Sequence, residues 1–255
     1  MPLIKSPRHT RRDIETWERL EAYDQALADR LPITEMEDTA WDVIAKFWEQ
    51  DPGVGYASTS WGKDSTVLAH LIAQLPIEIP LVWVRVEQWE NPDCELVRDQ
   101  YLDLHPHMRD RYHEIIVPAT ARRWWDPEAE TESTGRRTSR GGFDQAAARF
   151  GARHISGIRA EESRVRRIAQ SRWGHYSDGA CRPIGTWKAT DVFAYLYARG
   201  LPVHPAYAMS VGGALDRRWL RVSSLGGVRG ADRGRAEWEA RYYPDVIYQE
   251  GGAPA

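Results

Sequence analysis

Apolar residues at helical spacing dominate the N-terminal part of the chain. Over residues 11–30 an apolar side chain recurs every three or four positions, at Ile14, Trp17, Leu20, Tyr23 and Leu27, which predicts an amphipathic helix. A second helix is predicted from Thr34 to the break at 51–53, because Thr34 and Glu37 have the spacing of a capping box. We therefore expect a helical segment over residues 1–50 that packs on the body of the protein or on a second copy, as a homodimer.

Beyond this segment the pattern changes to short apolar runs that alternate with helical spacing. Strands are predicted at 54–60, 80–86 and 112–117, and helices at 65–74 and 91–105. Such alternation is typical of βαβ units, in which helices cross over between parallel strands. The predicted fold class is α/β, a Rossmann-like and mostly parallel sheet with helices on both faces.

The second half of the chain is less regular. Residues 118–142 are polar and charged, and we expect a loop or lid there. The alternation resumes with strands at 152–159 and 181–184 and helices at 161–170 and 189–198. From residue 209 the chain is rich in glycine and arginine and has weak periodicity. These changes predict a helical segment (1–50), an α/β nucleotide-binding domain (51–207) and a C-terminal extension (208–255).

Composition and charge place the chain among ordinary globular proteins. Hydrophobic residues make up 42% and charged residues 28%, and the net charge is −3, so no global positive field favours nucleic acid. The two cysteines, Cys94 and Cys181, are too few for a four-cysteine iron–sulfur cluster, and none is expected. No apolar run is long enough to span a membrane and the N terminus has no apolar signal region, so we expect a cytoplasmic protein without a membrane partner.

The loop between the first predicted strand and its helix carries the strongest candidate chemistry. It reads Ser60-Trp61-Gly62-Lys63-Asp64-Ser65. Backbone N–H groups at a helix start are unpaired and the helix dipole favours an anion there, so a phosphate is expected to bind. Lys63 adds positive charge, and the Asp64 carboxylate suits Mg²⁺. The loop is not a Walker A motif, which has Ser or Thr where Asp64 stands. The alternative is a strand–helix turn in which Asp64 only caps the helix.

Three blocks of the sequence resemble one known family. The loop 60–65 is similar to the SGGKDS pyrophosphate loop of the PP-loop ATP pyrophosphatase superfamily, with Trp61 in place of the first glycine. Residues 157–163 (GIRAEES) are similar to the GIRADES-type motif of the phosphoadenosine phosphosulfate (PAPS) reductase family, and residues 182–202 to its PI-x-x-W…DV-x-x-Y…LP segment. The resemblance implies an adenine nucleotide alpha-hydrolase-like fold that binds ATP or PAPS, with Mg²⁺ as the metal.

The resemblance and the expected sheet edge together single out a set of site residues. Arg159 follows a predicted strand, so it should emerge at the carboxyl edge of the sheet, where a guanidinium can bind a phosphate or sulfate. The candidate catalytic residues are Lys63, Asp64 and Arg159, and Asp64 is also the candidate metal ligand. The candidate nucleotide-binding residues are Ser58, Ser60, Trp61, Gly62, Lys63, Asp64, Ser65, Gly157, Arg159 and Glu162. For Glu161 and Glu162 a structural role is equally open, because carboxylates are favourable in a helix's first turn.

The chain departs from PAPS reductases in its cysteines. Those enzymes carry a nucleophilic cysteine in a C-terminal tail, whereas no cysteine follows Cys181 here. Cys94 is expected to be a buried structural thiol. We therefore favour ATP cleavage at the α-phosphate, by pyrophosphatase or adenylyl-transfer chemistry that activates an unknown acceptor in sulfur transfer or nucleic-acid modification. Two alternatives stay open: PAPS reduction by an atypical cysteine, and a non-catalytic nucleotide-binding or sensor subunit.

Arginines of the C-terminal extension form a further candidate surface. Arg217, Arg218, Arg221, Arg229, Arg233 and Arg235 precede the aromatic residues Trp238, Tyr242 and Tyr243. Arginines with neighbouring aromatic residues can bind an anionic substrate or a nucleic-acid backbone. Acidic residues interleave with them at Glu237, Glu239 and Asp245, so a solvated surface is an equal alternative.

Overall fold

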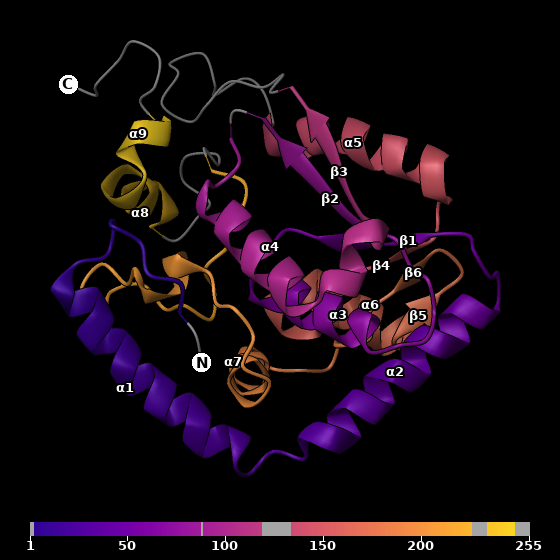
Figure 1. Cartoon of the computed structure of the whole chain (residues 1–255), viewed down its shortest axis with the longest axis horizontal. Coiled ribbons are helices and arrows are strands. Elements are labelled where there is room, and N and C mark those ends of the chain that lie inside the picture. Colours follow the sequence, from indigo (N-terminus) through magenta and orange to yellow (C-terminus); the bar gives the residue numbers. More distant parts are fainter. Residues whose placement is uncertain (1–2, 88, 119–133, 226–233, 248–255) are drawn as a thin grey trace.

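Helices and strands alternate along most of the chain in a computed structural model that describes residues 3–87, 89–118, 134–225 and 234–247, with the backbone alone over 134–139 (Figure 1). The elements are α1 (Arg11–Ala28), α2 (Ile33–Glu49), β1 (Tyr56–Thr59), α3 (Lys63–Ala73), β2 (Leu81–Val86), α4 (Asp93–Leu104), the 3₁₀ helix η1 (Pro106–Arg111), β3 (Tyr112–Val117), α5 (Thr134–Phe150), β4 (His154–Ile155), η3 (Ala160–Glu162), α6 (Arg164–Trp173), β5 (Tyr176–Ser177), β6 (Ala180–Cys181), α7 (Ala189–Ala198), η4 (Pro205–Ala208), α8 (Arg235–Tyr242) and α9 (Pro244–Ile247).

One mixed sheet organises these elements. Within the described residues it has six strands in the order β3-β2-β1-β4-β6-β5. Neighbouring strands are parallel except β5 and β6, which are antiparallel. β1 lies in the middle, since Ala57 is in register with Leu81 of β2 on one side and with Ile155 of β4 on the other. The predicted mostly parallel α/β sheet is confirmed, and the direction of chain progression reverses between β1 and β4.

Helices cover both faces of the sheet, as predicted. Successive side chains of a strand point to opposite faces. Leu81 and Trp83 of β2 join the large core with α3 and α4, whereas Val82 and Val86 join a smaller cluster with Ala146 of α5. Figure 1 shows α5 running along β2 and β3, with α3 and α4 over the rest of the sheet.

The N-terminal helices form two arms of a V against the α/β body (Figure 1). A Thr10–Asp13 capping box begins α1, but the capping box predicted at Thr34 and Glu37 is wrong. Helix α2 begins at Ile33 without a side-chain cap. The Glu37 carboxylate is buried instead, where it accepts hydrogen bonds from the Tyr195 hydroxyl and the Arg199 guanidinium. A cation and a hydroxyl from α7 outcompete the backbone N–H that a cap would offer.

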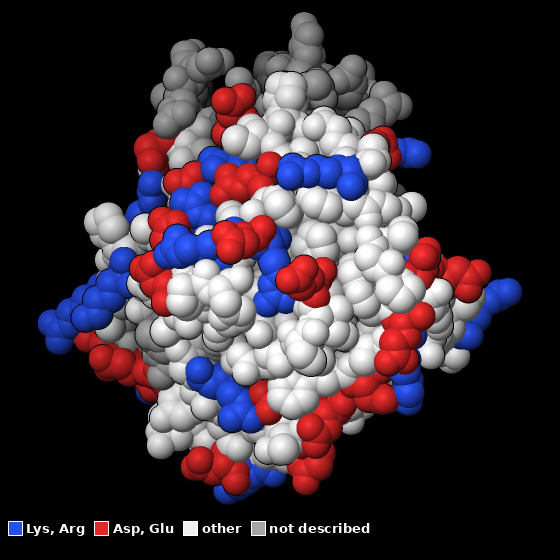
Figure 2. All heavy atoms as spheres, turned by 45° about the vertical axis from the view of Figure 1, so that its right-hand side comes forward, with Lys and Arg blue, Asp and Glu red and all other residues white. Residues whose placement is uncertain are grey.

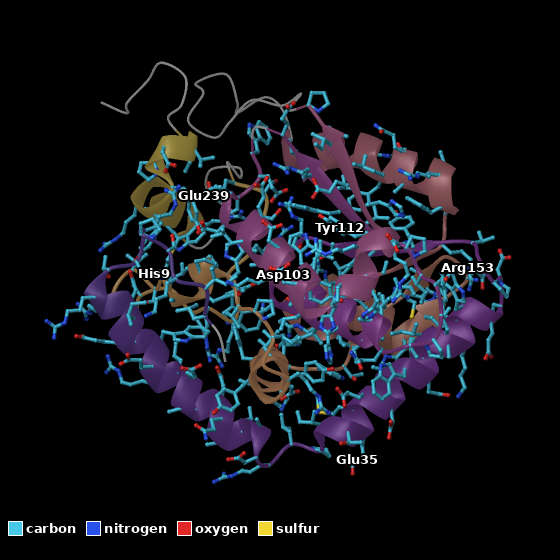
Figure 3. All side chains as sticks on the ribbon, in the orientation of Figure 1. His9, Glu35, Asp103, Tyr112, Arg153 and Glu239 are labelled. Atoms are coloured by element: carbon cyan, nitrogen blue, oxygen red, sulfur yellow. The ribbon has the colours of Figure 1, made fainter. Side chains whose placement is uncertain are left out.

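Arg153 joins the end of α2 to the sheet (Figure 3). Its guanidinium donates to the Phe47 carbonyl oxygen at 2.6 Å and to the Asp178 carbonyl oxygen at 3.0 Å, and it lies 4.0 Å from the centre of the Phe47 ring. This side chain immediately precedes β4. It therefore fixes the short strand whose extension leads to Arg159.

The structure corrects several predicted elements. Residues 134–142 of the predicted loop belong to helix α5, while 119–133 lie outside the described residues. Few apolar residues mark α5, because it needs only a narrow contact: Gly142 lets it approach Val84 of β2 closely. The strand predicted at 152–159 is only His154–Ile155. The strand predicted at 181–184 is Ala180–Cys181, and the extension holds helices α8 and α9.

The hydrophobic core draws residues from all parts of the chain. Side chains from α1, α2, α3, α4, α7 and α8 belong to a single cluster. Trp187, Val192, Phe193 and Leu196 are buried there. In the described residues no helix is long and apolar enough to cross a membrane. On the face shown in Figure 2, basic and acidic side chains are interspersed, in keeping with a net charge of −3.

Candidate functional site

The candidate site lies where strand order reverses in the sheet. Residues 60–62 follow the carboxyl end of β1 and lead into α3. Residues 156–159 follow the carboxyl end of the neighbouring strand, β4. In open α/β sheets this reversal point opens the crevice in which ligands bind. The placement predicted for Arg159 beside the loop is correct, although the strand ends four residues earlier than expected.

The loop is closed by its own hydroxyl group. The Ser65 hydroxyl donates to the Gly62 carbonyl oxygen at 3.0 Å and accepts from the Ser60 backbone N–H at 3.1 Å. These bonds hold the turn against the first turn of α3, so the Ser65 side chain shapes the loop from within. Ser60 is exposed and is the loop residue most open to a ligand.

Trp61 fills the space beneath the loop. Its backbone has φ +55°, a left-handed conformation that glycine adopts more easily. The indole is fully buried, with ring centroids 5.2 Å from Tyr101 and 5.7 Å from Tyr112. Burying this large aromatic surface offsets the backbone strain. Its side chain therefore packs inside the protein, and only its backbone is placed to meet a ligand.

Three charged residues meet at the start of α3. The Lys63 ammonium lies 3.0 Å from one carboxylate oxygen of Asp64, and the Arg159 guanidinium donates to the other at 2.6 Å. Lys63 and Arg159 are buried, whereas Asp64 is partly accessible. The structure thus brings together the three residues that the sequence nominates for catalysis, although they are up to 96 positions apart.

Arg159 sits in a dense polar shell. It donates to the Glu161 carboxylate at 2.7 Å and to the Trp187 carbonyl oxygen at 3.4 Å, while its second terminal nitrogen, Nη2, is buried without a hydrogen-bond partner in the described residues. Burial by itself lowers the pKa of Arg159, but the Asp64 and Glu161 carboxylates outweigh it and raise that pKa. The guanidinium is therefore fixed and charged, with one donor unused.

Gly157 allows the two halves of the site to touch. A Cβ atom at this position would lie 2.8 Å from the Asp64 carbonyl oxygen and 3.2 Å from the Ser65 backbone nitrogen. Any side chain here would push the β4 extension away from α3. The glycine of the second sequence block thus acts through backbone approach.

The other two candidates are engaged within the chain. The Ser58 hydroxyl donates to the Ile155 carbonyl oxygen of β4 at 3.4 Å. Glu162 accepts the Arg159 backbone N–H at 3.0 Å and forms an ion pair with Arg166. These three contacts brace the site, which for Glu162 agrees with the structural alternative.

Sequence reasoning missed the residues that cover the loop. The Tyr207 hydroxyl accepts the Lys63 backbone N–H at 2.9 Å, in the position expected for a phosphate oxygen. Residues 220–225, the cover segment, cross the same loop: a Cβ on Gly62 would lie 3.2 Å from Val222. The Val222 carbonyl oxygen also accepts from Asn91 at 3.0 Å. A tyrosine and a valine carry no chemical signature, so only the fold reveals them.

A buried polar cluster supports the loop from the β2 side. The Cys94 sulfur lies 3.5 Å from the Ser60 carbonyl oxygen and 3.5 Å from His204 Nε2. His204 Nδ1 accepts the Ala206 backbone N–H at 3.1 Å, so Nε2 carries the proton and donates to the sulfur. Burial raises the pKa of Glu90, next to Cys94, to about 7. Cys94 is buried, as predicted.

The site offers one carboxylate to a metal ion. In the residues that the structure describes, no three His, Cys, Asp or Glu side chains gather in a way that could hold a metal. Asp64 is the carboxylate nearest to the expected phosphates, and both its oxygens contact cations. Mg²⁺ is often held by one or two carboxylates together with substrate phosphates. A metal at Asp64 would therefore need further oxygen ligands from the nucleotide.

Comparisons with known proteins place most of the chain in one family. The family model described as phosphoadenosine phosphosulfate reductase domain matches residues 56–229. Phosphoadenosine 5'-phosphosulfate reductase from Synechococcus sp. is 27% identical over 184 residues, which cover 68% of this chain and 78% of that protein.

Solved structures with a related arrangement are more distant. PAPS reductase from Candida auris, in a phosphate complex, has a TM-score of 0.47 and 14% identity, covering 68% of this chain and 87% of that one. FMN adenylyltransferase from Candida glabrata has a TM-score of 0.45 and 12% identity, covering 74% of this chain and 66% of that one.

Proposed function

This chain belongs to the phosphoadenosine phosphosulfate reductase domain family, and from that premise we propose that it binds ATP at the loop of residues 60–65 and cleaves it at the α-phosphate. An acceptor attacks the α-phosphorus and pyrophosphate leaves. The product is either AMP, when water is the acceptor, or an adenylylated acceptor. A nucleotide-binding function of the PAPS reductase type is what the family membership supports directly.

The proposal rests on Arg159, which is buried beside Lys63 and Asp64 at the start of α3. Its guanidinium contacts Asp64, and its terminal nitrogen Nη2 has no hydrogen-bond partner in the described residues. The Asp64 and Glu161 carboxylates compensate the buried charge, but a buried Nη2 without a partner costs free energy that a phosphate oxygen could recover. A phosphate there would meet Arg159, the Lys63 ammonium and the unpaired N–H groups of α3. Such fixed positive groups stabilise the charge that develops on a leaving pyrophosphate.

Ligand binding requires local rearrangement. The Lys63 backbone N–H is bonded to the Tyr207 hydroxyl, so a phosphate oxygen must displace that hydroxyl. Lys63 also exchanges Asp64 for a phosphate, which frees Oδ2 of the carboxylate while Oδ1 keeps its bond to Arg159. Asp64 would then hold Mg²⁺, which supplies further charge neutralisation at the phosphates.

The buried thiols argue against a reductase that uses its own cysteine. A thiolate is the nucleophile in such chemistry. Both cysteines are buried, and burial raises the pKa of Cys181 to about 12 and that of Cys94 well above its ordinary value. PAPS reduction by this chain predicts thioredoxin-dependent release of sulfite that Cys181→Ser abolishes.

Calorimetric titration with ATP and with PAPS, each with Mg²⁺, tests the binding step. We expect saturable ATP binding that Lys63→Ala weakens by about tenfold or more, since a charged hydrogen-bond partner contributes about 1.5–3 kcal/mol. Lys46→Ala is the matched control, because Lys46 is an exposed lysine on α2 that pairs with Asp42. Equal weakening by both substitutions, or binding of neither nucleotide, refutes the site.

Product analysis tests the chemistry. ATP labelled at the α-phosphate should yield labelled AMP or a labelled acceptor, and Asp64→Asn should slow this release while ADP formation stays absent. Saturable binding without any α-phosphate product would instead favour the sensor alternative. Sulfite release from PAPS would favour the reductase.

A further inference from the structure

Helix α6 follows the site directly and has an unusual surface. In its ten residues no side chain is buried. A surface helix ordinarily turns its apolar residues toward the core. Here Val165 is 76% exposed, Ile168 56% and Trp173 52%, while the polar Arg166 and Gln170 lie on the less exposed side. The helix thus presents apolar side chains to solvent and rests on polar ones.

The charges of α6 also oppose the stability of the helix. Its sequence holds four arginines and no acidic residue. Arg164, Arg166 and Arg167 fall in the first turn, where the helix dipole disfavours cations. Arg166 pairs with Glu162, but Arg164, Arg167 and Arg172 have no ion pair within the described part of the chain. Within the described residues neither packing nor helix stability explains this arrangement, which makes α6 a candidate surface for an external partner.

Basic residues also lie next to the loop of residues 60–65. Arg221 is exposed, and it precedes Val222 of the cover segment. Val222 would lie 3.2 Å from a Cβ on Gly62, and α6 begins five residues after Arg159, which contacts Asp64. The arginines of α6 and those of residues 218–221 therefore flank the start of α3.

Exposed aromatic rings accompany the arginines at both ends of this surface. The Arg172 guanidinium lies 5.3 Å from the centre of the Trp173 ring. Trp219 is 41% exposed, between Arg218 and Arg221. Guanidiniums that bind phosphates and rings that stack on bases are the two components of single-strand binding surfaces. A duplex would use the charges but not the rings, so exposed rings beside arginines favour an unpaired strand.

We propose that α6 and residues 218–221 form a binding surface for single-stranded nucleic acid that leads to the nucleotide site. The arginines contact the phosphates, and Trp173 and Trp219 stack on unpaired bases. The surface needs no nucleotide at the loop, so strand binding and ATP binding are separable. Its position beside the loop would bring a strand within reach of the α-phosphate.

Fluorescence anisotropy with labelled single strands of about 20 nucleotides, DNA and RNA, tests the surface. The variant Arg164→Gln/Arg167→Gln/Arg172→Gln should weaken binding at least tenfold. It should also reduce the slope of log affinity against log salt by about 2, since each phosphate contact contributes about 0.7. The matched control removes three exposed arginines elsewhere, Arg11→Gln/Arg19→Gln/Arg109→Gln, and should retain both affinity and slope.

Trp173→Ala separates stacking from charge. It should weaken single-strand binding about five- to tenfold and leave the salt slope unchanged. The triple variant should bind ATP like the unmodified protein, because none of its positions contacts the loop. A failure of ATP binding in the unmodified protein would therefore refute the proposed function and leave the strand surface standing.

Three results would overturn the surface. One is the absence of saturable strand binding at low salt. Another is equal loss in the triple variant and its control. The third is duplex bound as tightly as single strand, since this removes the role of the tryptophans. If an acidic protein partner bound α6 and Val165→Ser/Ile168→Ser abolished that contact while strands did not bind, the helix would be a protein-docking surface instead.

Discussion

Arg159 and the arginines of α6 are neighbours in sequence and opposites in environment. Arg159 is buried, and its charge is matched by Asp64 and Glu161. Arg164 and Arg167 lie only a few residues later in the chain. They are exposed and have no ion pair in the described residues. One side chain is held in a fixed geometry by the protein, and the others are left for whatever approaches from solvent.

This difference separates two uses of the same residue type. A buried guanidinium acts through position, so its contribution depends little on salt and strongly on its partners. Exposed guanidiniums act through their summed field, which salt screens. Interior changes should therefore have large effects on stability, while changes on α6 should act mainly on binding and alter stability only slightly.

Arg159→Ala should show the largest effect. Removing the guanidinium leaves Glu161 without its cation and Asp64 with Lys63 alone, and loss of one partner from a buried ion pair costs about 3–5 kcal/mol. Urea denaturation measures the change in the free energy of unfolding. Arg172→Ala, an exposed site, should change it by less than about 0.5 kcal/mol. Equal effects would remove the distinction between the two groups.

The buried carboxyl of Glu90 should make stability depend on pH. Burial raises its pKa from 4.5 to about 7, so the folded state favours the protonated form. The stabilisation is fully present below pH 4.5 and is lost as pH rises through about 7, a change of roughly 3 kcal/mol. Unfolding measured across this window should show that loss relative to Glu90→Gln. Parallel pH curves for the two proteins would contradict it.

Gly157→Ala should separate the halves of the site. The new Cβ would lie 2.8 Å from the Asp64 carbonyl oxygen, and such overpacking against backbone costs about 1–3 kcal/mol. Thermal unfolding and ATP calorimetry should both show a loss. Gly179→Ala is the control, since no atom lies within 4 Å of its Cβ position. A stable Gly157→Ala protein with full ATP affinity would mean that β4 and α3 need not touch.

Arg164→Glu should show the smallest effect, with the opposite sign. A carboxylate at the first position of α6 suits the helix dipole, so the free energy of unfolding should rise by about 0.3–1 kcal/mol. Single-strand affinity should fall in the same protein. A fall in stability would show that Arg164 stabilises the fold, and Arg164 would then no longer differ from Arg159 in this respect.

The main site was predictable because its residues have recognisable chemistry and because each of them follows a predicted strand. Lys63 and Asp64 stand at a strand–helix turn, and Arg159 follows a strand, so the parallel-sheet rule brings them to one edge. The contact between the Lys63 N–H and the Tyr207 hydroxyl spans 144 positions. No local pattern predicts such a pairing, because it depends on how α7 and the following segment pack on the sheet.

Predictions from local sequence were wrong or incomplete where tertiary contacts determine the structure. Glu37 has the spacing of a cap but binds Arg199. Helix α5 has little apolar periodicity, because the small residues Gly142 and Ala146 make its close contacts with the sheet. Trp61 stands where the family has glycine, and its burial against Tyr101 could not be read from the loop alone.

The central position of β1 has a consequence for the order in which the chain folds. β1 pairs with β2 across a short crossover, whereas the bond from Arg159 to Asp64 closes 95 residues. Closing a longer loop costs more chain entropy, and distant pairings slow folding. We therefore expect the β1–α3–β2 unit to form first and the β4 extension to dock last. Nucleotide affinity would then appear only in the final step of folding and would serve as its kinetic marker.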